Sequence, residues 1–412
     1  MIMDNKSLLK YAELAIKVGV NLRKGEMLVV NAPVSAQKFV EIVVKQAYKA
    51  GARNVEVQWT DEIVSRLNYK YRSKKELSKV PEWVKVRSDS YIDERIAYLN
   101  VFSEDPECLK GINPEKVAIF RRARGKALEK FRDYTGSNKL RWCIIAYPNK
   151  AWAKKMFPSL NANEALKKQW EYIKKTVRLD YDNPIEAWKE HQERITRRCK
   201  TLNDAKITAF HYKNSLGTDV TVGMPKGYIF CGGAEKGELD GIYFTANMPT
   251  EEVFSCPDRN AVNGKIVAAL PLCRNGQIID KFWFEFNNGR IVDYGAEQGC
   301  DNLKTIIETD EGSHYLGEIA LVGYNSPIRN LETMFYETLF DENASCHFAI
   351  GDCYPTCLEN GGDMNKEELA EHGLNSSLEH VDFMVGTNDL EITATTEDGK
   401  TLKIFENGEW VI

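Results

Sequence analysis

Acidic and histidine side chains of the second half of the chain gather in four short segments. These are residues 247–257 with Glu251 and Glu252, 316–322 with Glu318, 342–355 with Glu342, His347 and Tyr354, and 380–386 with His380 and Asp382. Carboxylate and imidazole ligands without thiolate are typical of Zn, Co or Mn in a catalytic rather than a structural site. The residue types therefore indicate a metal centre built at strand ends and turns.

The spacing within two of these segments supports that interpretation. Residues i and i+2 of a strand share a face, so His380 and Asp382 should point together into one site. Glu318 lies near the start of a strand whose apolar sequence predicts burial. Burying a carboxylate there costs free energy unless the carboxylate is paired or bound to metal. Taken singly, each segment also has an ordinary structural explanation: a surface pair of glutamates, a satisfied core histidine, or a local salt bridge.

Other chemistries lack their motifs. The glycine-rich stretch at Gly232, Gly233 and Gly237 has Glu238 where a phosphate-binding loop needs lysine, so it indicates a turn. No G-x-S-x-G sequence is present, which argues against a serine hydrolase. His191 lacks the second histidine of the zinc-binding helix motif, and we expect it on the surface.

Three cysteines lie close to His347 in the sequence. Cys346, Cys353 and Cys357 do not have the paired spacing of a structural zinc site, so we expect them to be small packing residues. In an extended strand Cys346 would face away from His347. A thiol nucleophile with a distant histidine stays open, because such partners meet only in the fold.

The first half of the chain alternates strands and helices. Apolar spacing predicts an opening helix along Leu8, Ala12 and Ile16, and a second helix that Ser35 caps and Gly51 ends. The expected strands are residues 27–31, 55–59, 97–102 and 142–146, with a helix over 115–131. A strand, helix, strand unit makes its two strands parallel, so this half is predicted to be α/β with a largely parallel sheet.

The second half changes to short β-type runs. After helices that end near residue 199, strands are expected at 207–212, 218–222, 241–246 and 266–272, with hairpins turning at 287–289 and 398–399. The predicted organisation is thus an α/β domain over residues 1–200 and a strand-rich α+β catalytic domain over residues 201–412.

The composition of the 412 residues excludes several classes of protein. With 55 basic and 60 acidic residues the net charge is −5, and no basic, aromatic-rich surface is expected to bind nucleic acid. The opening residues lack the apolar core of a secretory signal, and no stretch is apolar enough for a membrane span. Ten cysteines without a signal are most simply reduced thiols, which favours the cytoplasm.

The four segments together resemble the aminopeptidase T and aminopeptidase S family of metallopeptidases. The resemblance lies in the motifs P-T-E-E-V-F, L-G-E-I-A-L-V, H-F-A-I-G-x-x-Y-P and H-x-D-F-M-V-G and in their order. It implies that Glu252, His347, His380 and Asp382 are metal ligands and that Glu318 bridges two metals. It places Tyr354 beside them and Glu251 outside the ligand shell. Glu342 matches an acidic position that is either a ligand or the general base.

The expected function is therefore hydrolysis of the N-terminal peptide bond of peptides by water activated at two divalent ions, of Zn, Co, Mn or Mg. The resemblance also implies a homodimer, with peptides bearing a free N-terminus as substrates. Two other functions compete with this one. They are a non-catalytic protein that binds metal or a small molecule, and a metal-dependent hydrolase of another amide or ester.

Overall fold

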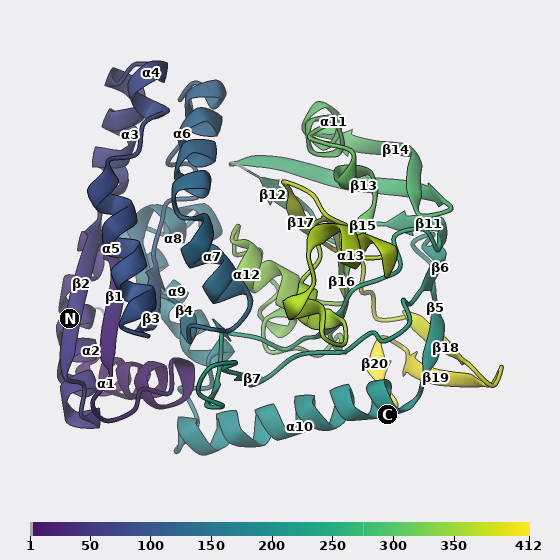
Figure 1. Cartoon of the computed structure of the whole chain (residues 1–412), viewed down its shortest axis with the longest axis horizontal. Helices are drawn as coiled ribbons and strands as arrows, with labels where there is room; N and C mark the ends of the chain where they lie inside the picture. Colours follow the sequence, from purple (N-terminus) through teal and green to yellow (C-terminus); the bar gives the residue numbers. More distant parts are fainter. Residues whose placement is uncertain (1–2, 275) are drawn as a thin grey trace. The chain divides into compact units, whose positions relative to one another are not determined.

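The computed structural model describes residues 3–274 and 276–412. Their contacts divide the chain into two compact units. Residues Met1–Lys189 and Ala234–Pro249 form the first unit, and Glu190–Gly233 and Thr250–Ile412 form the second. In Figure 1 the first unit is mostly purple and blue, and the second runs from teal to yellow.

A five-stranded parallel sheet forms the centre of the first unit. Its order is β2-β1-β3-β4-β9, and each neighbouring pair is parallel, which confirms the predicted α/β class. The strands are β1 (Met27–Pro33), β2 (Asn54–Thr60), β3 (Ala97–Phe102), β4 (Trp142–Ala146) and β9 (Asn247–Met248). A short hairpin of β7 (Glu235–Lys236) and β8 (Tyr243–Phe244) precedes β9.

Helices connect these strands. They are α1 (Asn5–Leu14), α2 (Gln37–Ala50), α3 (Glu62–Tyr71), α4 (Lys74–Leu77), α5 (Glu82–Asp93), α6 (Pro114–Ala127), α7 (Glu129–Gly136), α8 (Lys150–Met156) and α9 (Ala162–Thr176). Helix α10 (Pro184–Asp204) contains the division between the units. Among the helices of the described residues, none is long and apolar enough to cross a membrane.

Two helix predictions needed correction and one was confirmed. Gly51 ends α2 in a left-handed conformation, with φ of 97°, as predicted. Ser35 does not cap α2, because it lies inside a 3-10 turn at Val34–Ala36 and the helix begins after Ala36 without a side-chain cap. The helix predicted over 115–131 is two helices, since the backbone leaves the helical region at Leu128.

The second unit contains two antiparallel sheets. The nine-stranded sheet has the order β12-β13-β11-β6-β5-β18-β19-β20, with β14 paired to β13, and the four-stranded sheet has the order β10-β15-β16-β17. The larger sheet consists of β5 (Ile207–Lys213), β6 (Asp219–Gly223), β11 (Val262–Val267), β12 (Leu272–Arg274), β13 (Gln277–Asn287), β14 (Arg290–Gln298), β18 (Glu391–Thr396), β19 (Thr401–Glu406) and β20 (Glu409–Trp410).

The smaller sheet consists of β10 (Val253–Ser255), β15 (Leu316–Leu321), β16 (His347–Gly351) and β17 (His380–Met384). Three short helices complete the unit: α11 (Cys300–Ile307), α12 (Thr338–Asp341) and α13 (Lys366–Glu371). The strand-rich class predicted for this half is confirmed, as are the hairpins β13–β14 and β18–β19.

Two predicted strands are shorter than expected. Of residues 241–246 only Tyr243–Phe244 pair as a strand. The run 266–272 is divided between β11 and β12, with Pro271 in the gap, because proline cannot donate to a sheet ladder.

Aromatic side chains fill the space between the two sheets of the second unit. The ring of Phe348 on β16 lies 5.0 Å from that of Tyr212 on β5, and Phe383 on β17 lies 5.1 Å from Phe284 on β13. One face of the four-stranded sheet is therefore core. Because side chains alternate along a strand, the neighbours of Phe348 and Phe383 lie on the opposite face.

Candidate metal centre

The opposite face of the four-stranded sheet carries the predicted ligands. Glu318 lies on β15, His347 on β16, and His380 and Asp382 on β17, while Glu252 directly precedes β10. The sheet register pairs Glu318 with Ala349, and Ala349 with Asp382. Cross-strand partners share a face, so the small side chain of Ala349 leaves room between these two carboxylates.

A β-bulge directs Glu318 into this face. The register of β15 against β16 shifts between Leu316 and Glu318, which leaves Gly317 as the extra residue. A Cβ atom at Gly317 would lie 2.3 Å from the carbonyl oxygens of both Gly351 and Asp352. Only glycine allows the strands to approach this closely at the bulge.

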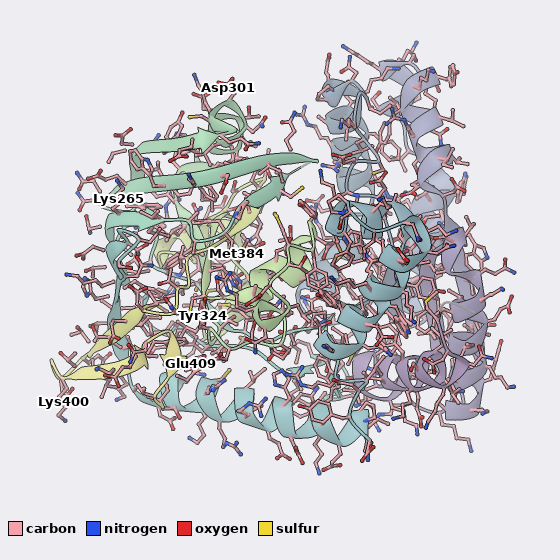
Figure 2. The ribbon with its side chains drawn as sticks, turned by 180° about the vertical axis from the view of Figure 1, so that it is seen from behind. Lys265, Asp301, Tyr324, Met384, Lys400 and Glu409 are labelled. Atoms are coloured by element: carbon pink, nitrogen blue, oxygen red, sulfur yellow. The ribbon has the colours of Figure 1, made fainter. Side chains whose placement is uncertain are left out.

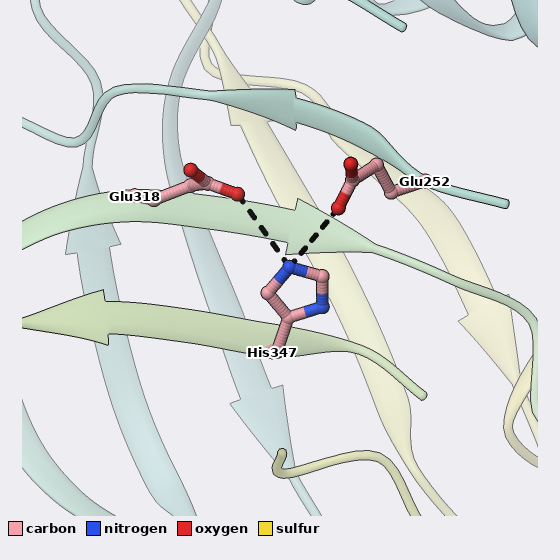
Figure 3. A group of neighbouring side chains, drawn as sticks. All are labelled: Glu252, Glu318 and His347. Carbon is pink, nitrogen blue, oxygen red and sulfur yellow. Dashed lines mark ion pairs between the residues drawn. The ribbon is translucent and has the colours of Figure 1, made fainter. Parts of the chain in front are cut away.

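Three of the predicted ligands form a first group. Nε2 of His347 lies 3.1 Å from a carboxylate oxygen of Glu252 and 3.5 Å from one of Glu318 (Figure 3). All three side chains are buried. The ligand atoms are close enough together to hold one metal ion.

A second group shares Glu318 with the first. Nε2 of His380 lies 3.1 Å from Asp382 and 3.4 Å from the other oxygen of Glu318, so Glu318 directs one oxygen toward each histidine. Glu318, His380 and Asp382 also satisfy the geometry of a metal-binding group. The predicted face sharing of His380 and Asp382 is confirmed by their contact.

The hydrogen bonds of the two histidines fit a cation in both groups. Nδ1 of His347 lies 3.1 Å from the carbonyl of Ser345, and Nδ1 of His380 lies 2.8 Å from that of Asp352. Because a carbonyl only accepts, each Nδ1 carries the hydrogen, as is usual for metal-ligating histidines. In a neutral ring Nε2 then presents a lone pair to two carboxylates, which is unfavourable without a proton or a metal ion between them. Nε2 of His347 is buried and makes no hydrogen bond.

The electrostatics of the cluster also favour bound positive charge. Burial lowers the pKa of both histidines, but the neighbouring carboxylates outweigh it and hold the pKa of each well above its ordinary value. Burial raises the pKa of Glu252 despite its contact with His347. For Glu318 and Asp382 burial is opposed by the histidines, and the pKa of each falls below its ordinary value.

Glu342 lies at this cluster without belonging to either group of ligand atoms among the described residues. It follows α12 and is held by Asn343, whose side-chain amide lies 3.4 Å from its carboxylate. Burial raises the pKa of Glu342 well above its ordinary value, and the negative charges of Asp382 and Glu252 raise it further. Such a carboxyl group is suited to accept a proton rather than to remain a fixed anion.

Tyr354 lies beside the second group. Its ring contacts that of His380 edge to face, with 5.2 Å between centroids, and it also packs on Phe254. Tyr354 as a whole residue is 43% exposed, so part of it is accessible from solvent while its ring adjoins a candidate ligand.

Glu251 belongs to a separate network behind Glu252. Its backbone N–H donates to the side-chain oxygen of Asn343 at 2.7 Å.

His191 is buried, contrary to the prediction that it lies on the surface. Arg194 donates to its Nδ1 at 2.8 Å, so Nε2–H donates to the carbonyl of Thr250, also at 2.8 Å. Residues that sequence reasoning missed, Asn343 and His191, thus hold the segment that presents Glu252. These two hydrogen bonds join residues that are 59 and 92 positions apart, so no local sequence pattern indicated them.

The cysteines near the centre are packing residues, as predicted. Cys353 and Cys357 are buried with Cys256, Leu358 and Leu374. Cys346 is in the core between the sheets, where its sulfur contacts the backbone of Val322.

Buried imidazole and carboxylate groups on a β-sheet, with a glutamate of raised pKa beside them, are the groups that a metal-dependent hydrolase requires. Residues 4–410 match the family model of the thermophilic metalloproteases (M29). The chain is 44% identical to aminopeptidase AmpS of Bacillus subtilis (strain 168), over 97% of each chain, and 36% identical to aminopeptidase T of Thermus aquaticus, over 99% of each. The solved structure of wild-type AmpT from Thermus thermophilus has a TM-score of 0.92 at 34% identity, covering 99% of each chain.

The chain therefore belongs to the M29 family of thermophilic metalloproteases and is a peptide hydrolase. Membership implies a divalent metal ion, and the donor set described above fits one. The family resemblance predicted from the four sequence motifs is confirmed.

Proposed function

We propose that this protein is an aminopeptidase that uses two divalent ions, one held by Glu252, Glu318 and His347 and the other by Glu318, His380 and Asp382. The observation that carries the proposal is the pair of three-residue groups that share Glu318. In each group the histidine is fixed through Nδ1, so that Nε2 faces the carboxylates. Relatives named aminopeptidases support the choice of an N-terminal peptide bond.

Bound ions would supply Lewis acidity, which polarises the peptide carbonyl and lowers the pKa of water from about 15.7 toward about 7. Glu342 would accept the proton of the attacking water and return it to the leaving amine, because it lies at the cluster without belonging to either group of ligand atoms, and burial with the neighbouring negative charges raises its pKa above the ordinary value. The phenol of Tyr354 would donate a hydrogen bond to the oxyanion of the tetrahedral intermediate.

The free α-amino group of the substrate is the feature that distinguishes an aminopeptidase from other amide hydrolases. An ammonium or amine fits a cluster that contains four buried or half-buried carboxylates, Glu252, Glu318, Glu342 and Asp382. An acetylated N-terminus has neither a positive charge nor a basic lone pair, so it cannot bind this cluster as an amine would. Substrates with a free N-terminus should therefore be preferred strongly.

The test is the initial rate on aminoacyl anilides, each free and N-acetylated, after chelation and after addition of Co, Zn, Mn or Mg. Metal-restored cleavage of only the free-amine substrates is expected. Equal rates on acetylated substrates would indicate a hydrolase of other amides. Bound ions with no turnover would indicate a non-catalytic binding protein.

The homodimer and the cytoplasmic location stay predictions of the sequence analysis, as does the absence of nucleic-acid and membrane partners. Which of the four metals is bound in the cell depends on availability as well as on the ligands.

A further inference from the structure

Four cysteines gather next to the segment that carries Tyr354. Cys256, Cys353 and Cys357 are buried together, and the half-buried Cys231 packs against them. None of the four belongs to either group of candidate metal ligands found among the described residues. Their chemistry is therefore that of free thiols, and two free thiols that lie close together can be oxidised to a disulfide.

The thiols of Cys231 and Cys357 interact directly. The side chain of Cys231 is in hydrogen-bonding contact with that of Cys357, and its sulfur lies 3.6 Å from the carbonyl oxygen of Thr356. The main chain holds the two segments together, because the N–H of Ile229 donates to the carbonyl of Cys357 at 2.8 Å. The contact between the two thiols is thus part of the backbone arrangement and does not depend on side-chain rotamers alone.

The two thiols differ in how readily they meet an oxidant. Cys231 is half-buried, whereas Cys357 is only 1% exposed. Contact with Cys231, together with burial, raises the pKa of Cys357 well above its ordinary value, so Cys357 stays protonated. Side chains fill the interior of this unit densely, for example around Met384 of β17 (Figure 2), which favours a small oxidant. Cys231 is therefore the thiol that reacts first, and Cys357 is placed to react with its oxidised form.

We propose that Cys231 and Cys357 form a reversible disulfide when the protein meets hydrogen peroxide, and that this bond slows catalysis by moving Tyr354. The sulfur of Cys231 first attacks one peroxide oxygen, and its thiol proton leaves with the other oxygen as water, which gives a sulfenic acid. The sulfur of Cys357 then displaces the hydroxyl group, which takes the second thiol proton and leaves as water. Two thiols have lost two electrons, and peroxide has been reduced to two water molecules.

The bond would move Tyr354 because both cysteines are connected to it. A disulfide needs its sulfurs about 2 Å apart, closer than two thiols in contact, so oxidation draws the segments together. Cys357 ends the 3-10 turn Pro355–Cys357, and its N–H donates to the carbonyl of Tyr354 at 3.0 Å. Phe254 exchanges two backbone hydrogen bonds with Cys231, and its ring packs on that of Tyr354 with 5.9 Å between centroids. Formation of the bond goes beyond the proposed function, whereas its effect on the rate rests on that function.

The experiment treats the reduced full chain, loaded with Zn or Mg, with hydrogen peroxide and then removes the peroxide with catalase. Neither ion has redox chemistry of its own that would interfere. The number of free thiols, ten per chain in the reduced protein, is expected to fall by two. Mass spectrometry of unreduced peptides should show Cys231 linked to Cys357, and dithiothreitol should reverse the link by thiol exchange.

The rate on free-amine aminoacyl anilides is measured before and after oxidation. We expect kcat to fall by about 10-fold or more, with a smaller change in KM, because loss of one donor to an oxyanion costs about 100-fold or more. Dithiothreitol should restore kcat.

Three variants make the test specific. Cys231→Ser changes a half-buried residue, so it should fold, keep the basal rate and resist peroxide. Cys357→Ser should likewise form no linked peptide, and Cys231→Ser decides the test alone if Cys357→Ser does not fold. Cys108→Ser is the matched control, because Cys108 is another half-buried cysteine but lies in the first unit. It should respond to peroxide as the wild type does.

An unchanged number of thiols would overturn the inference, as would a link between any other pair of cysteines or equal inactivation of wild type and Cys231→Ser. A Cys231 to Cys357 link with an unchanged kcat would overturn its effect on Tyr354. Failure of the proposed function is distinguishable from these results. If no free-amine substrate is cleaved with any metal, that function fails, whereas the thiol count and the peptide map need no substrate and still decide whether the bond forms.

Discussion

Glu318 contributes to both candidate metal groups, whereas each of the other ligands contributes to one. Its two carboxylate oxygens lie 3.5 Å from His347 and 3.4 Å from His380. Its amide analogue would keep the shape but lose the charge that both cations require. Because Glu318 contributes to both groups, the number of ions bound by a Glu318 variant tests whether this side chain bridges two metals.

We expect Glu318→Gln to lose both ions, and Glu252→Gln and Asp382→Asn to lose one ion each, when metal content is measured on purified protein. Activity should fall by at least about 100-fold in each case, in line with the several kcal/mol that such ions supply to a transition state. Glu367→Gln is the control, since Glu367 is an exposed residue of α13 and belongs to neither group among the described residues. Two ions retained in Glu318→Gln would contradict the bridging role.

At the scale of single elements, the bulge of β15 sets the position of a histidine as well as of Glu318. Gly317 packs against the carbonyl oxygens of Gly351 and Asp352, and the carbonyl of Asp352 accepts the hydrogen bond of His380 Nδ1. A side chain at Gly317 would push that carbonyl away. The orientation of His380 therefore depends on a glycine on a different strand.

Gly317→Ala is expected to weaken metal binding at the His380 and Asp382 group first, seen as loss of one ion at a chelator concentration that leaves the wild type loaded. It should also lower the free energy of unfolding by about 1–3 kcal/mol, the usual cost of overpacking. Gly362→Ala is the matched control, because a Cβ there meets nothing within 4 Å. Equal losses in both variants would argue against the proposed dependence.

The loop between β17 and β18 gives a prediction about pH. Hydrogen bonds from Ser215 and Thr387 lower the pKa of Asp389 to about 2. A depressed carboxyl pKa adds stability above the unfolded value of about 3.9, and that stability is lost as the pH falls toward 2. The advantage of the wild type over Asp389→Asn in unfolding free energy should be about 1 kcal/mol at pH 6, after allowance for solvent screening, and should shrink below pH 4. Denaturant titrations across this range check it, and a difference independent of pH would refute the assignment.

At the scale of the whole molecule, the metal centre gathers residues from 252 to 382 onto one sheet. Ions that bind the folded chain but not the unfolded chain stabilise the folded state by mass action. Chelation should therefore lower the melting temperature measured by calorimetry, and the second unit should account for most of the loss. Adding back the preferred divalent ion should reverse the shift. An unchanged melting temperature on chelation, with loss of the ions verified, would show that they do not support the fold.

The sequence predicted much of this architecture, for identifiable reasons. Strong local periodicity identified β1 to β4, and the two-residue period placed His380 with Asp382. Contacts between distant segments had no such signal. The two residues of β9 show no periodicity, and they join the parallel sheet only through hydrogen bonds to β4. His191 was misplaced because its partner, the carbonyl of Thr250, lies 59 residues away.

The order of strands in the four-stranded sheet has a consequence for its motions. Glu252 adjoins β10 and the pair His380 and Asp382 lies on β17, and these are the two edge strands of the sheet, whereas β15 and β16 are central. Each ion would thus tie an edge strand to the interior. After removal of the ions, amide hydrogens of β10 and β17 should exchange with solvent sooner than those of β15 and β16. The edge strands of the sheet would then unfold locally before the central ones.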